Sequence, residues 1–210
     1  MARNKAIFDA DILINMVKTK SLDFLISMFD QIYVSNYVWE QEIKNQTDVM
    51  KMLSKLKNKG YIILLEYEKL TVRQQEIYRQ AYELLKKRAP SDLVNEGERV
   101  TASFAKAHSV SYYMSDDNKA APYIKSLTEI SVINYCDLLF MMYSINNEEL
   151  KQITKFYEEY IKLFDKNCLP KTIRDKNGQA SEFANVMAKS FDKFNQNKGL
   201  DEFLKLLKTL

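Results

Sequence analysis

Short apolar runs alternate with longer amphipathic segments over the first 145 residues of the chain. The strand-like runs cover residues 5–9, 31–34, 61–66, 110–115 and 130–135. Between them lie segments with the apolar spacing of helices, and this alternation is typical of β-α-β units. Parallel strands need such crossovers. We therefore predict an α/β fold with a central, mostly parallel sheet of about five strands flanked by helices.

Residue types that favour helix termini mark several boundaries. Ser35 or Asn36 can cap a helix that carries NYVWEQEIKNQ, and Thr71 can open a long amphipathic helix that runs to about residue 88. The Ala-Pro-Ser sequence that follows breaks this helix. We expect Ser91 or Asp92 to cap the next helix, which carries NEGERVTASFAKAH.

The last part of the chain differs from the rest because its pattern is helical throughout, with one interruption around CLPKTIRDKNGQ. We therefore predict two regions, a sheet-containing domain over residues 1–147 and a helical C-terminal extension over residues 148–210. The extension is expected to pack on the domain, although its apolar positions also suit the docking of a partner protein.

Composition narrows the function classes. The net charge is only +3, so charge alone neither requires nor excludes a nucleic acid partner. The two cysteines, Cys136 and Cys168, form no CxxC pair, and the four glycines form no nucleotide-binding loop. The opening residues do not resemble a signal peptide, and no apolar run is long enough to span a membrane. We expect a cytoplasmic protein without membrane segments.

Acidic residues fall where predicted strands end or where helices pass the same edge of the sheet. These residues are Asp9, Glu40 or Glu42, Glu98, and Asp116 with Asp117. Ligands of open parallel sheets bind at the carboxyl ends of the strands. Taken singly, each acid has a simpler explanation as a helix cap or an exposed helix residue.

In order and local sequence, these segments resemble the PIN domain family over roughly residues 5 to 145. FDADILI is similar to the family's first strand and turn, and VSNYVWEQEI to its second strand and helix. NEGERVTASFAKAHSVSYYMSDDNKA resembles its Gly-Glu helix, apolar strand and Ser/Thr-Asp-Asp ending. The resemblance implies a three-layer PIN-like fold. It also implies that Asp9, Glu98 and Asp116 bind metal, with Asp117 as a neighbour and substitute.

The second acid of this pattern has two candidates. Glu42 is preferred because Ile43 follows it, as an aliphatic residue does in the family, and because it shares a helix face with Val38. Glu40 remains the alternative. Asp11 departs from the Asn, Ser or Thr usual at its position, so it either adds charge to the cluster or caps the first helix.

Clustered carboxylates suit metal-dependent hydrolysis. Two negative charges about 5 Å apart repel by roughly 3 kcal/mol at an effective dielectric near 20. A hard cation relieves this repulsion, so the expected cofactor is Mg²⁺ or Mn²⁺, which would polarise a phosphodiester and activate water. Asn118 and Lys119 can hold a phosphate, or can be a solvated helix start. The only histidine, His108, is expected at a helix end, away from catalysis.

The resemblance implies an endoribonuclease that hydrolyses RNA, with Asp9, Glu42, Glu98 and Asp116 as its catalytic acids. A compact domain of this kind is expected to be the toxin of a toxin-antitoxin pair, with an antitoxin protein and a second copy of the chain as candidate partners. A catalytically silent interaction protein and a housekeeping RNA-processing nuclease are the alternatives, because fold alone does not decide function.

Overall fold

A computed structural model describes residues 5–146, 150–165 and 168–208. The chain forms two compact units. The first comprises Met1–Ile14 and Phe29–Ile133, and the second comprises Asn15–Met28 and Asn134–Leu210. The predicted boundary between residues 147 and 148 lies outside the described residues. Packing of the C-terminal extension on the sheet domain stays a prediction.

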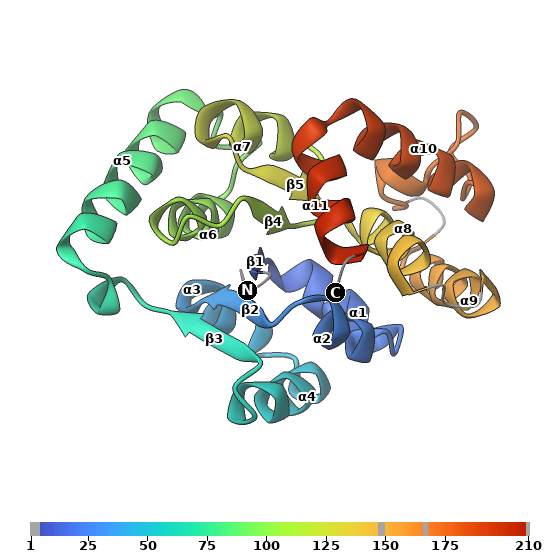
Figure 1. Ribbon diagram of the computed structural model, residues 1–210, viewed down its shortest axis with the longest axis horizontal. Coiled ribbons are helices and arrows are strands. Elements are labelled where there is room, and N and C mark those ends of the chain that lie inside the picture. The colour runs from blue at the N-terminus through green and yellow to red at the C-terminus, as the bar shows by residue number, and fades with distance from the viewer. Residues whose placement is uncertain (1–4, 147–149, 166–167, 209–210) are drawn as a thin grey trace. The chain divides into compact units, whose positions relative to one another are not determined.

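The first unit contains a five-stranded, all-parallel sheet in the order β3-β2-β1-β4-β5 (Figure 1). The strands are β1 (Lys5–Phe8), β2 (Gln31–Ser35), β3 (Ile62–Leu65), β4 (Tyr112–Met114) and β5 (Ser131–Ile133). Each lies within one of the predicted apolar runs or extends it by one residue. The predicted α/β fold with a parallel central sheet is confirmed.

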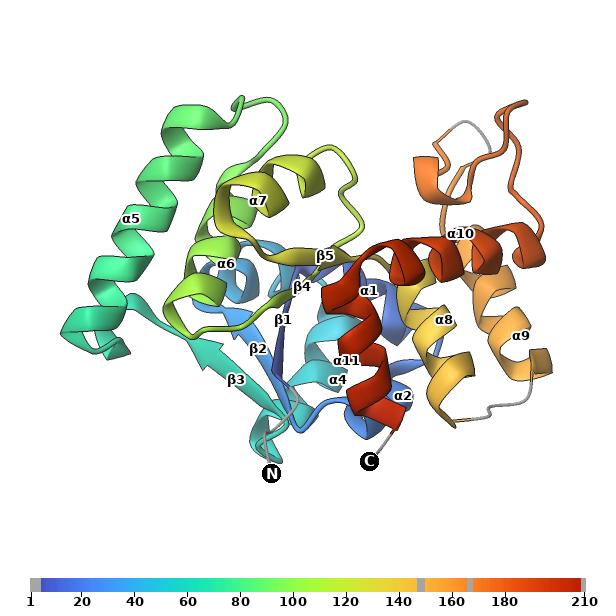
Figure 2. The same cartoon turned by 45° about the horizontal axis from the view of Figure 1, so that its top comes forward.

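Helices cover both faces of this sheet. The chain passes from β1 to β2 and β3 in one direction and from β4 to β5 in the other, so right-handed crossovers place the two sets of helices on opposite faces. α4 (Thr47–Asn58) packs beside β3, whereas α6 (Glu96–Ala107) packs on β1, β2 and β4. α5 (Val72–Arg88) and α7 (Ala121–Thr128) lie beside α6 (Figure 2). The unit therefore has the predicted three layers.

Local capping explains where the helices begin. The Ser35 hydroxyl accepts a hydrogen bond from the Val38 N–H and caps α3 (Asn36–Val38), and Thr71 forms a capping box at the start of α5, both as predicted. The predicted cap of α6 at Ser91 or Asp92 is wrong, because Asn95 caps that helix. Residues 90–94 form a turn closed by hydrogen bonds to the Pro90 carbonyl.

The second unit is helical. Its elements are the later part of α1 (Ala10–Lys18), α2 (Leu22–Met28), α8 (Tyr135–Asn146), α9 (Leu150–Ile161), the 3₁₀ turn Lys171–Ile173, α10 (Phe183–Gln196) and α11 (Lys198–Lys208). α9, α10 and α11 each pack on α8. Asp137, in the first turn of α8, accepts hydrogen bonds from the Asn134 N–H at 3.0 Å and the Ser190 hydroxyl at 2.9 Å, and forms an ion pair with Lys193. None of the described helices is long and apolar enough to cross a membrane.

Candidate metal centre

Asp9 directly follows β1 and is buried, with 7% of its surface exposed. Its Oδ2 accepts hydrogen bonds from the Tyr113 hydroxyl at 2.7 Å and the Ser115 hydroxyl at 3.3 Å, and its Oδ1 accepts one from the Ala10 N–H at 3.0 Å. Burial raises the pKa of Asp9, the three hydrogen bonds oppose that rise, and the charge of Asp117 adds to it. The carboxylate is thus held in one orientation and deprived of water.

The turn after β4 brings further acids to the same edge, because β4 is the neighbour of β1. The Asp116 N–H donates to Asp11 Oδ2 at 2.9 Å. Burial, followed by the charges of Asp9 and Asp116, raises the pKa of Asp11 well above its ordinary value. Asp117 Oδ1 accepts hydrogen bonds from the N–H groups of residues 119 and 120, at 2.6 and 3.1 Å. Asp117 therefore also has the capping role that is the simpler explanation of its position.

Glu98 reaches the site from the first turn of α6 and is only 2% exposed. Its Oε2 accepts the Asn95 N–H at 2.7 Å, and Asn95 Oδ1 accepts the Glu98 N–H at 3.0 Å. Its other oxygen, Oε1, is buried and has no hydrogen-bond partner among the described residues. Burial raises the pKa of Glu98 to about 8, and the charges of Asp117, Asp9 and Glu42 contribute to the rise.

Glu42 lies beside this helix start. A Cβ added at Gly97 would stand 2.6 Å from Glu42 Oε1, so the glycine makes room for the carboxylate. Glu42 is exposed by surface area, but partial desolvation of its carboxylate at the acidic edge and the charge of Asp9 raise its pKa to about 7. Glu40 instead pairs with Lys44 at 2.6 Å, one helical turn away in the same segment. These positions favour Glu42 over Glu40 as the second acid.

The residues predicted to bind substrate sit beside the acids. The Asn118 side-chain amide donates to the Asp116 carbonyl at 3.1 Å, which holds the turn after β4. Lys119 is exposed. Its backbone N–H donates a hydrogen bond to Asp117 Oδ1 in the turn. The ammonium group of Lys119 has no hydrogen bond or ion pair with the described residues.

The only histidine of the chain lies away from these acids. His108 caps the C-terminal end of α6, ten positions after Glu98, and this separation corresponds to about 15 Å along the helix axis. Its ring lies against Tyr33 with centroids 5.6 Å apart, and burial followed by the charge of Lys5 lowers its pKa. The chemistry of the acidic edge therefore depends on carboxyl groups.

The donor set suits a hard divalent cation, although it does not form a closed shell. Asp9, Glu42, Glu98 and Asp117 influence one another electrostatically. In the described part of the chain, no three Asp, Glu, His or Cys side chains lie close enough to hold one metal ion together. Mg²⁺ is usually bound through one or two carboxylates and several waters, so such a shell is not required. The buried, unpartnered oxygen of Glu98 is the feature that fits a cation best.

Two of the residues that support the site, Tyr113 and Ser115, were not among the predicted ones, whereas Asp11 was predicted either to add charge to the cluster or to cap the first helix and lies beside Asp9 and Asp116. Asp11, Tyr113 and Ser115 hydrogen-bond to the acidic residues or to the backbone around them. The Asp-x-Asp spacing of residues 9 and 11 was a signal for Asp11. Nothing in the sequence distinguished Tyr113 from an ordinary strand residue, because only the β1–β4 pairing brings it to Asp9.

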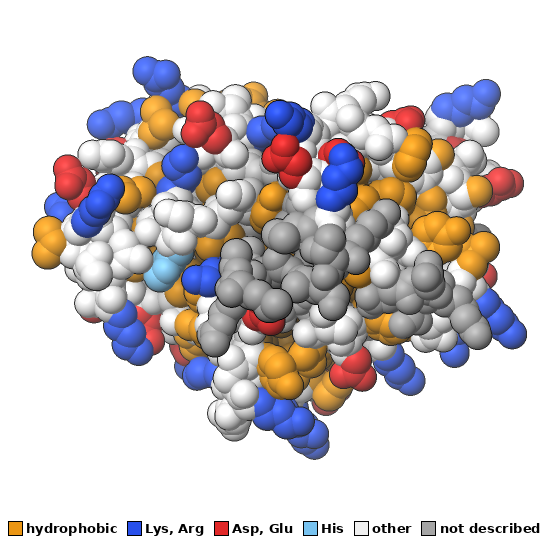
Figure 3. All heavy atoms as spheres, viewed as in Figure 1, with side chains coloured by type: hydrophobic (Ala, Val, Ile, Leu, Met, Phe, Trp, Pro, Cys, Tyr) orange, Lys and Arg blue, Asp and Glu red, His pale blue; other side chains and the backbone are white. Residues whose placement is uncertain are grey.

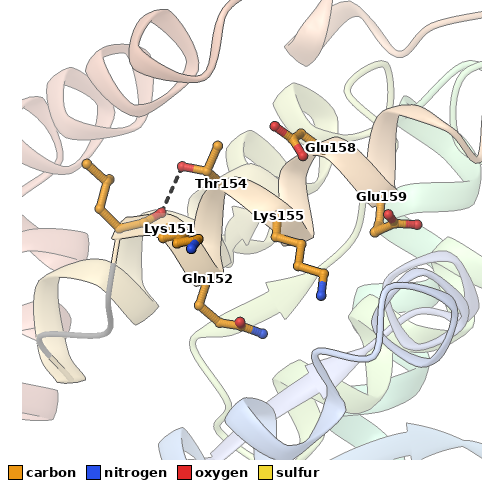
Figure 4. Close-up of a pocket in the computed structure, with 7 residues that line it drawn as sticks. Lys151, Gln152, Thr154, Lys155, Glu158 and Glu159 are labelled. Carbon is orange, nitrogen blue, oxygen red and sulfur yellow. Dashed lines mark hydrogen bonds between the residues drawn. The ribbon is translucent and has the colours of Figure 1, made fainter.

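A cavity of about 810 Å³ lies along α9 in the second unit (Figure 4). Its walls include Lys151, Lys155, Glu158 and Glu159, and the helix backbone there is supported by the Thr154 hydroxyl, which donates to a carbonyl one turn earlier at 2.7 Å. These side chains carry charges of both signs and include none of the predicted site residues. On the face drawn in Figure 3, the described Lys and Arg side chains are spread over the surface, with Asp and Glu side chains among them.

In comparisons with known proteins, the chain matches no family model, no curated protein and no solved structure. The resemblance to PIN domains therefore depends on the quoted residues.

Proposed function

We propose that this protein is a metal-dependent endoribonuclease of the PIN type. The observation that carries the proposal is the buried Glu98 carboxyl group, whose unpartnered Oε1 lies within the electrostatic reach of Asp9, Glu42 and Asp117 at the carboxyl ends of parallel strands. A buried group with an unmet polar atom is unfavourable unless a ligand, water or proton satisfies it. A divalent cation is the ligand that this set of oxygen donors favours.

Each acid has a separate part in this proposal. One or two carboxylates from among Asp9, Glu98 and the Asp116-Asp117 pair, completed by waters, would hold Mg²⁺ or Mn²⁺, which when bound would supply positive charge against a phosphodiester and make water easier to ionise. Tyr113 and Ser115 orient Asp9 by hydrogen bonds. Glu42, with its pKa near neutrality, is suited to accept a proton from the attacking water. Lys119 is suited to hold the phosphate.

The same proposal extends to biology. We infer that the nuclease is the toxin of a toxin-antitoxin pair, because this is the role that its resemblance to small PIN domains implies. An antitoxin could restrain it by offering an Arg or Lys to the carboxylates. A housekeeping RNA-processing role would use the same site and would differ in its effect on growth.

Cleavage of RNA tests the enzymatic part. We expect the purified protein to cleave RNA with Mg²⁺ or Mn²⁺ and to stop when EDTA is added. Asp9→Asn and Glu42→Gln should abolish cleavage while the circular dichroism spectrum stays unchanged. Glu40→Gln, which alters the acid paired with Lys44 in the same segment, is the matched control and should cleave normally. Cleavage that persists in metal-free protein would refute the proposal.

A further inference from the structure

A second cavity lies beside the acidic edge, within the first unit. It has a volume of about 230 Å³ and opens where β2 and β3 end. Its walls include Tyr37, which follows β2, Tyr67, which follows β3, and Tyr78 from α5. We call these three residues, with Glu68 at the rim, the tyrosine groove.

One wall of the groove presents an open aromatic ring. Tyr67 and Tyr78 pack edge to face with centroids 5.2 Å apart, so they support each other. Tyr37 is 38% exposed and makes no ring contact with another aromatic residue of the described chain. Aromatic rings in this state stack readily on the flat face of a base. Stacking is therefore available at Tyr37 without disturbing the aromatic core.

The acidic residues of the groove favour binding of a base over binding of a phosphate. Glu66 and Glu68 line it, and Glu66 is paired with Lys69 at 2.7 Å, whereas Glu68 is exposed. Carboxylates repel a phosphate but accept hydrogen bonds from the amino groups of cytosine, adenine and guanine. An acidic rim over aromatic walls thus fits a base and disfavours the backbone.

The groove is also next to the proposed cleavage site. In the order β3-β2-β1-β4, it lies at the ends of β2 and β3, while Asp9 follows β1. Neighbouring strands are about 4.8 Å apart, so the two places are separated by about 5 to 10 Å across the sheet. Gly97 lies between the groove and the acidic edge, since a Cβ added there would stand 3.6 Å from Tyr37 and 2.6 Å from the Glu42 carboxylate.

We propose that the tyrosine groove binds an unpaired base of the RNA substrate, one or two nucleotides from the phosphodiester that is cleaved, by stacking on Tyr37 and by a hydrogen bond to Glu68. The inference rests on the proposed ribonuclease function for its substrate. Because bases in a duplex are already stacked and paired, the groove selects single-stranded or unpaired RNA. A base with an amino group is preferred to uracil.

Binding in EDTA tests the groove separately from cleavage. The probes are short, fluorescein-labelled single-stranded oligocytidylate and oligouridylate, and fluorescence anisotropy gives the dissociation constants. Tyr37→Leu, which removes the aromatic ring, should weaken binding of oligocytidylate by about 5- to 150-fold. Tyr37→Phe keeps the ring and should bind like the wild type. Tyr61→Leu is the matched control, because Tyr61 is also 38% exposed but precedes β3, at the opposite end of the strand.

Glu68 is tested by a ratio, so that a change in overall charge cancels. The wild type should bind oligocytidylate more tightly than oligouridylate, and Glu68→Leu should remove this preference. The proposal that the groove binds a base would be overturned if wild type and Tyr37→Leu bound oligocytidylate equally, or if the wild type bound no RNA. Binding that depends on Tyr37 without cleavage at any metal concentration would instead overturn the nuclease proposal and leave the groove intact.

Discussion

Replacing Glu98 by glutamine changes the pH dependence of stability in a direction that the structure fixes. The folded protein raises the pKa of this group from 4.5 to about 8, mainly because the carboxyl group is buried. The folded state therefore binds a proton that the unfolded state releases. The contribution of Glu98 to stability is greatest below pH 4.5, falls as the pH rises towards 8, and changes little above that. Glutamine resembles the protonated carboxyl group and does not titrate.

The magnitude follows from these two pKa values. Each pKa unit corresponds to about 1.36 kcal/mol, so ionisation of Glu98 should cost metal-free protein about 3.5 kcal/mol of unfolding free energy between about pH 5 and pH 8. The amide oxygen of the introduced glutamine can still accept the Asn95 N–H in the capping box, so the start of α6 should survive the substitution. Relative to wild type, Glu98→Gln should thus gain about 2 to 4 kcal/mol over this range.

Urea denaturation in EDTA at several pH values measures this difference. Glu40→Gln is the control, because its exposed ion pair with Lys44 should contribute less than about 1 kcal/mol at any pH. Mn²⁺ at 1,000 times its dissociation constant should cancel or reverse this difference, since it stabilises the wild type by about 4.1 kcal/mol and should bind the variant less tightly. Parallel pH profiles for wild type and Glu98→Gln would refute the reasoning.

Three further predictions concern the acidic site, the start of α8 and the effect of the protein on growth. Gly97→Ala should displace the Glu42 carboxylate and reduce RNA cleavage at least tenfold, while thermal unfolding changes little because alanine favours the helix by about 1 kcal/mol. Asp137→Ala should lower the unfolding free energy by about 2 to 3 kcal/mol in urea titrations, because it leaves the Asn134 N–H and the buried Ser190 hydroxyl without their acceptor, while Lys193 is 37% exposed and can be solvated. Expression of the wild type should arrest bacterial growth, and expression of Asp9→Asn should not; equal growth of both, with cleavage demonstrable in vitro, would move the function to RNA processing.

The parallel sheet could be predicted because each of its strands is a short apolar run between amphipathic helices. α8 could not, since its first eight residues are all buried and it has no polar face to give a helical period. The cap of α6 was misplaced because Ser91 and Asp92 are as suitable chemically as Asn95, and only the turn after Pro90 decides among them. Local preference was outweighed there by the path of the chain.

The acids at strand ends could be located from the sequence, because the carboxyl ends of parallel strands share one edge. The residues that hold these acids by hydrogen bonds could not be located from the sequence. The hydrogen bond from Tyr113 to Asp9 spans 104 positions, and the one from the Asp116 N–H to Asp11 spans 105. Both depend on the pairing of β1 with β4, which no local pattern specifies. The choice of Glu42 over Glu40 gained its support from Gly97, a residue whose need for space appears only when α6 is in place.

Two helices of this chain begin with the same motif, and the contrast between them bears on the site. Asn95 with Glu98 and Asn134 with Asp137 each form reciprocal hydrogen bonds at a helix start, and both acids are 2% exposed. Asp137 is neutralised by an ion pair with a lysine and accepts a further hydrogen bond from a serine hydroxyl. Glu98 keeps an unpartnered oxygen among other carboxylates. Capping therefore explains Asp137 completely and Glu98 only in part, because a cap alone would be better served by a cation beside it than by more negative charge. Capping does not explain the unpartnered Oε1 of Glu98, and a metal ion would satisfy that oxygen.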